Sequence, residues 1–285
     1  MKNEKLKMNI RTIGIGMVLA AMISSCGQQT NNATEKKSKQ EVKAVSEYLD
    51  SSRWGKALAK DVEVGDFDAF KSEGNIEVVF KQTDVCVVKT VGHEKSLALY
   101  EVDVKEVDGK RQLEVRLKDG AEEKYDNIPT ITLLLGAPIL KEVVVANGDV
   151  ELKGSIVQNE DLAMYIRDEG DVIIKDIEVG SLKMVLDGKG DVTIKKAKCD
   201  GDADLLINDE GDIEGKVRCK NAKLQTNGSG TIDLNLKCKE LTAICNGRGD
   251  IELKGECMVI KKKESAFGSV DSRKMIADKV ILSEK

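Results

Sequence analysis

The alternation of hydrophobic and polar residues repeats along the C-terminal half of the chain with a period near 20 residues. Each unit begins with a glycine that is followed by Asp, Thr or Ser and then by a β-branched residue, as in "GDVELK", "GDVIIK" and "GDIELK". A fixed period of this length indicates a solenoid or another array of stacked units. The glycines are Gly148, Gly170, Gly190, Gly211, Gly230, Gly249 and Gly268, at steps of 22, 20, 21, 19, 19 and 19 residues.

Inside each unit the alternation has a period of two, which is the period of a β-strand, because successive side chains of a strand point to opposite faces. A second alternating run, such as Leu162/Met164/Ile166, closes most units. Two or three short strands per unit, without helices or proline, predict an all-β, right-handed parallel β-helix with coils of about 20 residues, since parallel crossovers are nearly always right-handed. The predicted inward residues include Val172, Ile174, Val192, Ile194, Leu182, Leu186, Ile251 and Leu253.

Glycine-rich pairs mark the corner at which each coil starts. Asn147-Gly148, Asn227-Gly228 and Asn246-Gly247 are residue pairs that tolerate positive φ, and we expect this conformation at the corner. The tripeptide Arg248-Gly249-Asp250 has the sequence of a cell-attachment motif. Other corners read "KGD", "EGD" or "NGD", so we interpret the tripeptide as one more corner.

The N-terminus has the features of a secretion signal. Basic residues, among them Arg11, precede an apolar run from Ile13 to Ile23 that is too short to span a bilayer. The run ends in "ISSC", which resembles the bacterial lipobox and implies cleavage before Cys26 and lipidation of its sulfur. A lipid-modified Cys26 would anchor the mature protein in a membrane.

The composition divides the chain into three parts. Residues 1–25 are predicted to be a lipoprotein signal peptide. Residues 26–60 form a polar tether, in which Val42, Val45 and Leu49 permit one short amphipathic helix. Residues 61–285 form a single β-helix head domain, because strand-like segments from "GNIEVVF" onward continue into the repeats without a linker. We expect these upstream strands to be earlier, less regular coils of the same solenoid.

The segments "DFDAFKSEGNIEVVFKQ" and "APILKEVVVANGDVELKG", followed by coils that start with Gly-Asp-Val, resemble the GIN head domain family of auto-transporter adhesins. This family is common in lipoproteins of Bacteroidetes. The resemblance covers most of the chain and implies a β-helical head on an envelope lipoprotein. It supplies no catalytic or binding residues.

Charge narrows the range of partners. The net charge is −5 and the signal peptide is basic, so the rest of the chain is more acidic still, which argues against nucleic acid as a partner. The second coil position is mostly Asp, from Asp149 to Asp250, and the sixth is mostly Lys. We interpret these columns as a solvated outer face. Calcium between corners is the alternative, but the period differs from that of calcium-binding nonapeptides, and we predict no metal site.

Four cysteines, Cys199, Cys219, Cys238 and Cys257, follow one another at steps of 20, 19 and 19 residues. They should therefore stack as an inward ladder on successive coils. Four sulfurs in a line cannot form the tetrahedron that zinc requires. We predict buried thiols that pack as small hydrophobic side chains, with disulfides between coils as the alternative.

A catalytic constellation is not visible in the sequence. The one histidine, His93, lies in a predicted loop and is expected to be solvated, and no nucleophile or phosphate-loop motif occurs. We therefore predict no enzyme activity, no catalytic residues and no cofactor. The predicted function is a binding or structural envelope lipoprotein with a role in adhesion, and its partner is an envelope protein or a glycan. The alternative is a polysaccharide-binding or polysaccharide-degrading β-helix, to be separated by a glycan screen with a Trp54→Ala variant.

The residues behind Cys26 bear on location. In lipoproteins of Bacteroidetes, acidic residues close behind the lipidated cysteine commonly accompany surface display. Here "GQQTNNATE" follows, with no acid before Glu35. We therefore predict a lipid anchor in the outer membrane with the head on the periplasmic face, and the cell surface is the alternative.

Overall fold

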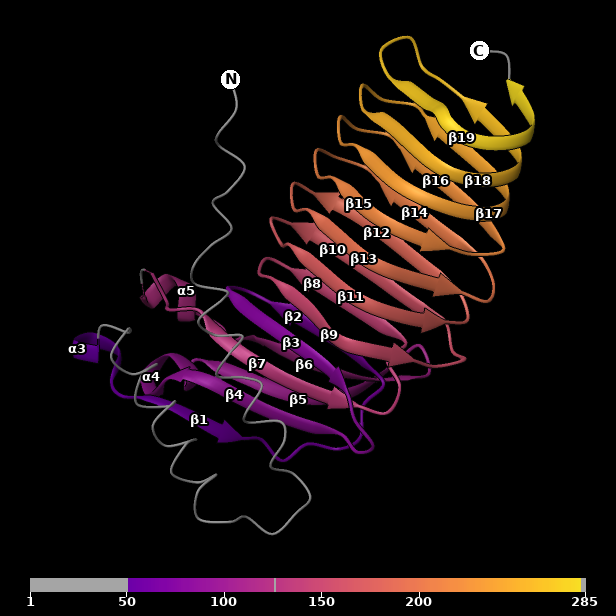
Figure 1. The fold of residues 1–285 in the computed structure, drawn as a ribbon. Helices are drawn as coiled ribbons and strands as arrows, with labels where there is room; N and C mark the ends of the chain where they lie inside the picture. The colour runs from indigo at the N-terminus through magenta and orange to yellow at the C-terminus, as the bar shows by residue number, and fades with distance from the viewer. Residues whose placement is uncertain (1–50, 126, 283–285) are drawn as a thin grey trace.

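The structure is a computed structural model that describes residues 51–125 and 127–282. Strands make up 65% of it and helices 4%, and the coils form about 7 turns spaced about 20 residues apart. The chain is therefore an all-β solenoid, as the repeat predicts. Figure 1 shows the coils stacked along one axis, with β1 and β19 near opposite ends.

The elements in chain order are α3 (Ser51–Trp54), β1 (Ala57–Asp61), β2 (Ala69–Glu73), β3 (Ile76–Gln82), β4 (Val87–His93), α4 (Glu94–Leu97), β5 (Tyr100–Val107), β6 (Lys110–Leu117), α5 (Ala121–Lys124), β7 (Ile131–Ala137), β8 (Glu142–Ala146), β9 (Val150–Val157), β10 (Leu162–Asp168), β11 (Val172–Val179), β12 (Leu182–Gly188), β13 (Val192–Cys199), β14 (Ala203–Ile207), β15 (Ile213–Arg218), β16 (Asn221–Thr226), β17 (Ile232–Cys245), β18 (Asp250–Lys263) and β19 (Ser269–Leu282).

From β8 onward the strands form two parallel ladders. In the first ladder β8, β10, β12, β14 and β16 pair in turn and continue into the C-terminal parts of β17, β18 and β19. In the second ladder β9, β11, β13 and β15 pair in turn and continue into the N-terminal parts of the same three strands. Val172 pairs with Val192 and Val192 with Ile213, so equivalent residues of successive coils lie on one another.

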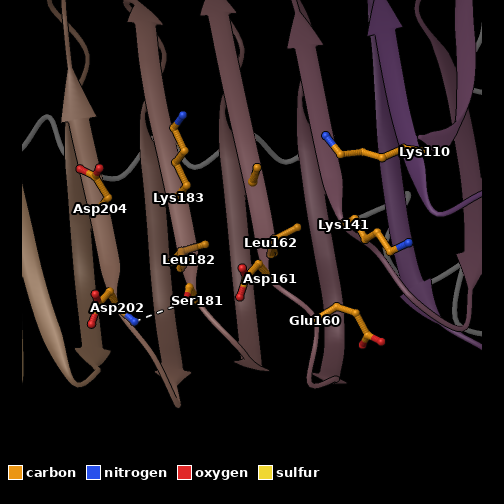
Figure 2. Close-up of a pocket in the computed structure, with 11 residues that line it drawn as sticks. Lys110, Lys141, Glu160, Asp161, Leu162, Ser181, Leu182, Lys183, Asp202 and Asp204 are labelled. Atoms are coloured by element: carbon orange, nitrogen blue, oxygen red, sulfur yellow. Dashed lines mark hydrogen bonds between the residues drawn. The ribbon is translucent and has the colours of Figure 1, made fainter. Parts of the chain in front are cut away.

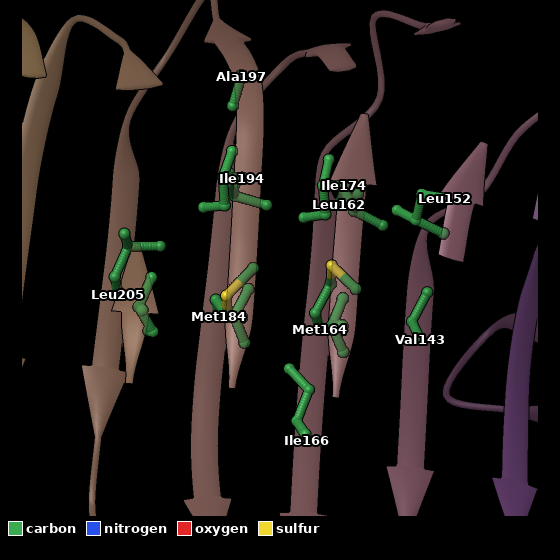
Figure 3. Close-up of a cluster of buried hydrophobic side chains, with 14 of the residues drawn as sticks. Val143, Leu152, Leu162, Met164, Ile166, Ile174, Met184, Ile194, Ala197 and Leu205 are labelled. Carbon is green, nitrogen blue, oxygen red and sulfur yellow. The ribbon is translucent and has the colours of Figure 1, made fainter. Parts of the chain in front are cut away.

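The core lies between the two ladders and consists of the predicted inward residues. Figure 3 shows Val143, Met164, Met184 and Leu205 in one row, facing Leu152, Ile174 and Ile194 of the other ladder. The inward prediction is confirmed, because each predicted residue is at most 3% exposed. The residues are Val172, Ile174, Val192, Ile194, Leu182, Leu186, Ile251 and Leu253.

The N-terminal region joins the solenoid in a different order from the one expected. β2 pairs with both β6 and β8, and β3 pairs with both β7 and β9, all in parallel. The coil that comes first in the sequence, β2–β3, therefore lies between the β6–β7 coil and the β8–β9 coil. The upstream strands are therefore less regular coils of the same solenoid, as expected, but their order along its axis differs from their order in the sequence.

Antiparallel strands make this reordering possible. β4 pairs antiparallel with β7 and with β1, and β5 pairs antiparallel with β6. The β5–β6 hairpin turns at Asp108 and Gly109, whose φ angles are 51° and 73°. Asp-Gly is a favoured pair for such a tight turn, so a direct reversal of the chain replaces the crossover that parallel strands need.

The corner glycines are required for two different reasons. At Asn147-Gly148 the φ angles are 60° and 99°, which confirms the expected positive φ. Gly228 and Gly247 do not have positive φ, so the expected reason is wrong for these two corners. A Cβ on Gly247 would lie 1.9 Å from the carbonyl oxygen of Gly228, and one on Gly228 would lie 2.0 Å from that of Asp209. Close stacking of the backbone excludes a side chain there.

The folded region extends beyond the boundary expected from the sequence. β1 starts at Ala57 and pairs with β4, so the sheet begins before Asp61. The signal peptide, Cys26 and the helix expected around Val45 lie outside the described residues. Within residues 51–125 and 127–282, no helix is long and apolar enough to cross a membrane.

Candidate functional site

The aspartate column on the outer face forms a hydrogen-bonded ladder. The backbone N–H of Asp171 donates to Asp149 Oδ1 at 3.1 Å, and that of Asp191 donates to Asp171 Oδ1 at 2.8 Å. The same bond joins Asp212 to Asp191 and Thr231 to Asp212. These carboxylates thus accept bonds from the next coil, and this contact accounts for the conserved spacing of Asp after Gly along the repeat.

Stacking the carboxylates has an electrostatic cost. Partial burial raises the pKa of Asp149 and of Asp191 above the ordinary value, and the charge of the neighbouring Asp171 raises both further. The backbone bonds from Asp171 and Asp212 act in the opposite direction, because they favour the ionised form. The net direction for these two pKa values is upward, so at neutral pH the fold disfavours the charges of Asp149 and Asp191.

Lysines and acids elsewhere on the outer face pair from coil to coil. Lys198 lies 2.9 Å from Glu178, and Lys237 lies 2.6 Å from Glu256. The hydrogen bond from Lys237 is the main cause of the lowered pKa of Glu256. Such exposed pairs contribute little to stability. The lysine column itself forms similar pairs, since Lys175 lies 3.3 Å from Glu151 and Lys254 lies 3.3 Å from Asp233, in agreement with a solvated outer face.

The tripeptide Arg248-Gly249-Asp250 is a corner of the coil, as predicted. A Cβ on Gly249 would lie 2.0 Å from the carbonyl oxygen of Gly230. Asp250 Oδ1 accepts hydrogen bonds from the N–H and the hydroxyl of Ser269, at 3.1 and 2.7 Å. The Arg248 guanidinium lies over the Phe267 ring, 5.9 Å from its centroid. All three residues therefore have contacts that the coil itself explains.

The cysteine ladder is present, with one deviation. Cys199, Cys219 and Cys257 are 5%, 8% and 6% exposed, whereas Cys238 is half-buried. Cys238 pairs with Cys257 in the strand register, and their Sγ atoms are 3.5 Å apart. All four are free thiols in the structure.

Burial also determines the chemistry of these thiols. It raises the pKa of Cys199 to about 12, and burial together with the hydrogen bond to Cys238 raises that of Cys257 to about 12. The pKa of Cys238 is raised chiefly by its hydrogen bond with Cys219 and then by burial. Because the thiolate is the nucleophile, thiols with raised pKa are poor candidates for catalysis.

A shallow groove crosses the outer face of the first ladder (Figure 2), with a volume of about 490 Å³. Lys110 forms an ion pair with Glu142 at 2.5 Å, and the hydrogen bond between them is the main cause of the raised pKa of Lys110. Lys141 forms an ion pair with Asp68 at 2.9 Å. Acids outnumber lysines in the lining, so the groove suits a neutral or cationic ligand better than an anionic one. The charged lining residues are Lys110, Lys141, Lys183, Glu160, Asp161, Asp202 and Asp204.

Two residues that the sequence analysis singled out are buried. His93 is 3% exposed and its Nδ1 lies 2.9 Å from the carbonyl oxygen of Gly55, so the expectation of a solvated histidine is wrong. Trp54 is 9% exposed and packs against Tyr125, with ring centroids 5.7 Å apart. It is therefore unsuited to stack on a sugar. An aromatic side chain on the outer face is Tyr165, which sequence reasoning missed; the Lys183 ammonium lies 5.4 Å from its ring centroid.

Metal binding finds no support in the side-chain geometry. Among the described residues, no group of three or more His, Cys, Asp or Glu side chains is arranged to hold a metal ion. The corner aspartates that were considered for calcium instead accept backbone hydrogen bonds.

The fold and the outer columns define a β-solenoid domain with a charged, solvated outer face. Residues 66–206 and 195–284 match the family model described as "Putative auto-transporter adhesin, head GIN domain". These matches cover most of the chain, and the chain belongs to this family. No curated protein matches it.

Several solved structures have a similar fold. A putative adhesin from Parabacteroides distasonis ATCC 8503 is 19% identical with a TM-score of 0.59, and the match covers 80% of this chain and 97% of that one. A putative lipid binding protein from the same organism is 15% identical with a TM-score of 0.58, over 80% and 97%. A putative adhesin from Bacteroides fragilis NCTC 9343 is 19% identical with a TM-score of 0.50, over 82% and 99%. At these identities the likeness concerns the fold.

Proposed function

We propose that the chain is the binding head of a cell-envelope lipoprotein and that it acts by contact, without catalysis. The observation that carries this proposal is the regular outer face, on which charged side chains pair from coil to coil. Such a face offers an extended contact surface and no constellation of nucleophile, base and oxyanion donors. The adhesin names of the family and of its structural relatives support the same function.

Anchoring through Cys26 is part of this proposal. The full chain should incorporate labelled palmitate, and a Cys26→Ala variant should incorporate none and keep its signal peptide. Persistent labelling of the variant would contradict the anchor. A Ser25→Ala variant is the matched control, because it keeps a small residue before the cysteine and should still be labelled.

The location of the head is proposed to be the periplasmic face of the outer membrane. Protease added to intact cells should leave the full-length protein intact, together with a periplasmic control protein. Rapid loss of the protein while the control survives would place the head on the cell surface. That outcome would also make adhesion to other cells the leading form of the contact function.

The groove of Figure 2 favours a second candidate, a polysaccharide bound across the coils. In a glycan screen with the full chain, a bound neutral glycan should be weakened by Lys183→Ala or Tyr165→Ala, since both residues lie on this face. Lys254→Ala, on the second ladder, is the matched control. If the glycan is bound equally by all variants, the groove is not the site. New reducing ends that an Asp204→Asn variant fails to produce would contradict the non-catalytic function.

A further inference from the structure

The last strand, β19, leaves one end of the solenoid open. It pairs with β18 along one edge, from Asp250–Ser269 to Lys262–Leu282, and no other described strand pairs with its second edge. Figure 1 shows β19 as the terminal coil. β19 is 14 residues long and contains neither proline nor glycine. Such an edge presents a row of unpaired backbone groups to which another strand can add.

The end of the hydrophobic core is open at the same place. One inward position is occupied in three successive coils by Leu241, Ile260 and Val280, which pair in register. Leu241 and Ile260 are fully buried, whereas Val280 is 51% exposed. Leu282 is 68% exposed for the same reason, since no described coil covers it. A further strand on β19 would remove this apolar surface from water.

The residues of β19 are arranged symmetrically about Ile276, which is itself 75% exposed. Met275 and Ala277 flank it, and both pack against the core. Lys274 and Asp278 flank this group with opposite charges, and both are exposed. If a second β19 paired antiparallel with Ile276 opposite Ile276, each Lys274 would therefore face the Asp278 of the other copy, and the apolar residues would face one another.

We propose that β19 pairs antiparallel with β19 of a second copy of this chain, about a two-fold axis through Ile276. Such an interface is self-complementary and closes after two copies. One kind of like-charge contact arises, twice per dimer, between Arg273 of each copy and Lys279 of the other. The Arg273 guanidinium is already neutralised by Asp271 at 2.7 Å, so this contact does not prevent pairing.

The dimer gives the two heads a defined relative direction. The described chain begins at the end opposite β19 (Figure 1), so the first described residues of the two copies would lie at opposite ends of a doubled rod. If the heads were displayed on the cell surface, the alternative location, the contact would then join molecules anchored on two facing cells. This consequence rests on the proposed anchoring through Cys26, whereas the pairing of β19 does not.

A cross-linking experiment tests the pairing. The full chain is purified in detergent in both the native and the Cys26→Ala form, and each form carries Ile276→Cys. Under mild oxidation, the Ile276→Cys variants should form a disulfide-linked dimer, because the two introduced thiols meet on the axis. The matched control is Val157→Cys, at a hydrophobic residue that is 58% exposed and remote from β19. It should give at least about tenfold less dimer.

A charge exchange tests the register. Lys274→Asp or Asp278→Lys alone places like charges together twice per dimer and should weaken association about tenfold. The double variant restores opposite charges and should regain most of the dimer. Circular dichroism and the melting temperature of each variant show whether the fold is retained.

Specific outcomes overturn the proposal. Equal cross-linking at positions 276 and 157, or none at either, rules out the interface. A ladder of higher oligomers indicates head-to-tail stacking instead, and a cross-link to a protein of different mass indicates another partner. Dimerisation of the Cys26→Ala form together with failed palmitate labelling of the native chain would reject the anchor and keep the dimer.

Discussion

The two ends of the solenoid are finished in different ways. At the N-terminal end β4 covers β7, β1 covers β4 and β5 covers β6, all in antiparallel pairs. Most residues of β1 face solvent and include Lys60 and Asp61. At the C-terminal end no described strand covers β19, and Ile276, Val280 and Leu282 are exposed.

The difference shows that a regular repeat cannot pair the outer edge of its own last coil. Each coil offers its neighbour the same edge, so stacking alone always leaves a final edge unpaired. The N-terminal region departs from the repeat: its outermost described strands, β1 and β5, also pair along one edge only, but they are antiparallel to their neighbours and carry mostly polar or charged exposed residues. The C-terminal end keeps the repeat to its last strand and therefore keeps the edge.

The largest expected effect distinguishes the regular coils from the irregular region. Gly190→Val should lower the free energy of unfolding by more than about 4 kcal/mol, a loss of the size that backbone strain and overpacking cause. A Cβ there would lie 2.0 Å from the carbonyl oxygen of Gly170. The matched control is Gly65→Val, because nothing lies within 4 Å of a Cβ at Gly65. Urea denaturation measures both, and equal losses would contradict the stacking role of the corner glycine.

The reaction rates of the Cys199 and Cys257 thiols measure local unfolding of the coils from the β19 end. With a pKa of about 12, Cys199 and Cys257 have a thiolate fraction about a thousandfold lower than an ordinary thiol at pH 8. Both should therefore react slowly with a maleimide in the native protein and fast after unfolding.

Cys257 should nevertheless react faster than Cys199, because it lies closer to the uncovered strand and ends of repeat arrays fray first. Mass spectrometry of the labelled peptides gives both rates. Faster labelling of Cys199 would contradict an open C-terminal end. A disulfide between Cys238 and Cys257 would instead show that the ladder is oxidised.

Two substitutions at equivalent inward positions of β18 and β19 measure how far the core is exposed to solvent at the C-terminal end of the solenoid. Ile260→Ala should destabilise the protein by about 3 kcal/mol, since it removes a fully buried side chain. Val280→Ala, one coil further, should cost less than about 1 kcal/mol in dilute protein, because the side chain is half exposed. Thermal or urea unfolding gives both values. A Val280→Ala cost that grows with protein concentration would support the dimer, and a cost that stays small at all concentrations would contradict it. A cost as large as that of Ile260→Ala in dilute protein would show that the end is covered in the monomer.

The smallest expected effect concerns the aspartate ladder. The pKa of Asp191 is raised in the folded state, so stability is lost as pH rises from the ordinary value of 3.8 through the raised one. Asp191→Asn keeps the acceptor for the Asp212 N–H and removes the charge. It should stabilise the protein at pH 7 by less than about 1 kcal/mol after solvent screening, and give no gain at pH 3. A loss of stability at pH 7 would show that the ionised carboxylate is favoured.

Sequence patterns predicted the coils because the relevant information is local. Alternation with a period of two assigned Val172, Ile174 and their equivalents to the core, since strand geometry fixes the side on which each residue points. The same reasoning identified Arg248-Gly249-Asp250 as a corner. It failed at His93, whose burial depends on the backbone of Gly55, a segment far away in the sequence.

The sequence by itself therefore determined the length of the coil, its inward residues and the alignment of equivalent positions, because one repeated pattern specifies all of them. Only the tertiary structure decided that the β2–β3 coil lies between β6–β7 and β8–β9, and that Gly228 and Gly247 avoid a clash where positive φ was expected. It also decided that antiparallel strands end the solenoid at one end and a parallel strand, β19, at the other. These features arise from contacts between residues that are distant along the chain, and no local periodicity encodes such contacts.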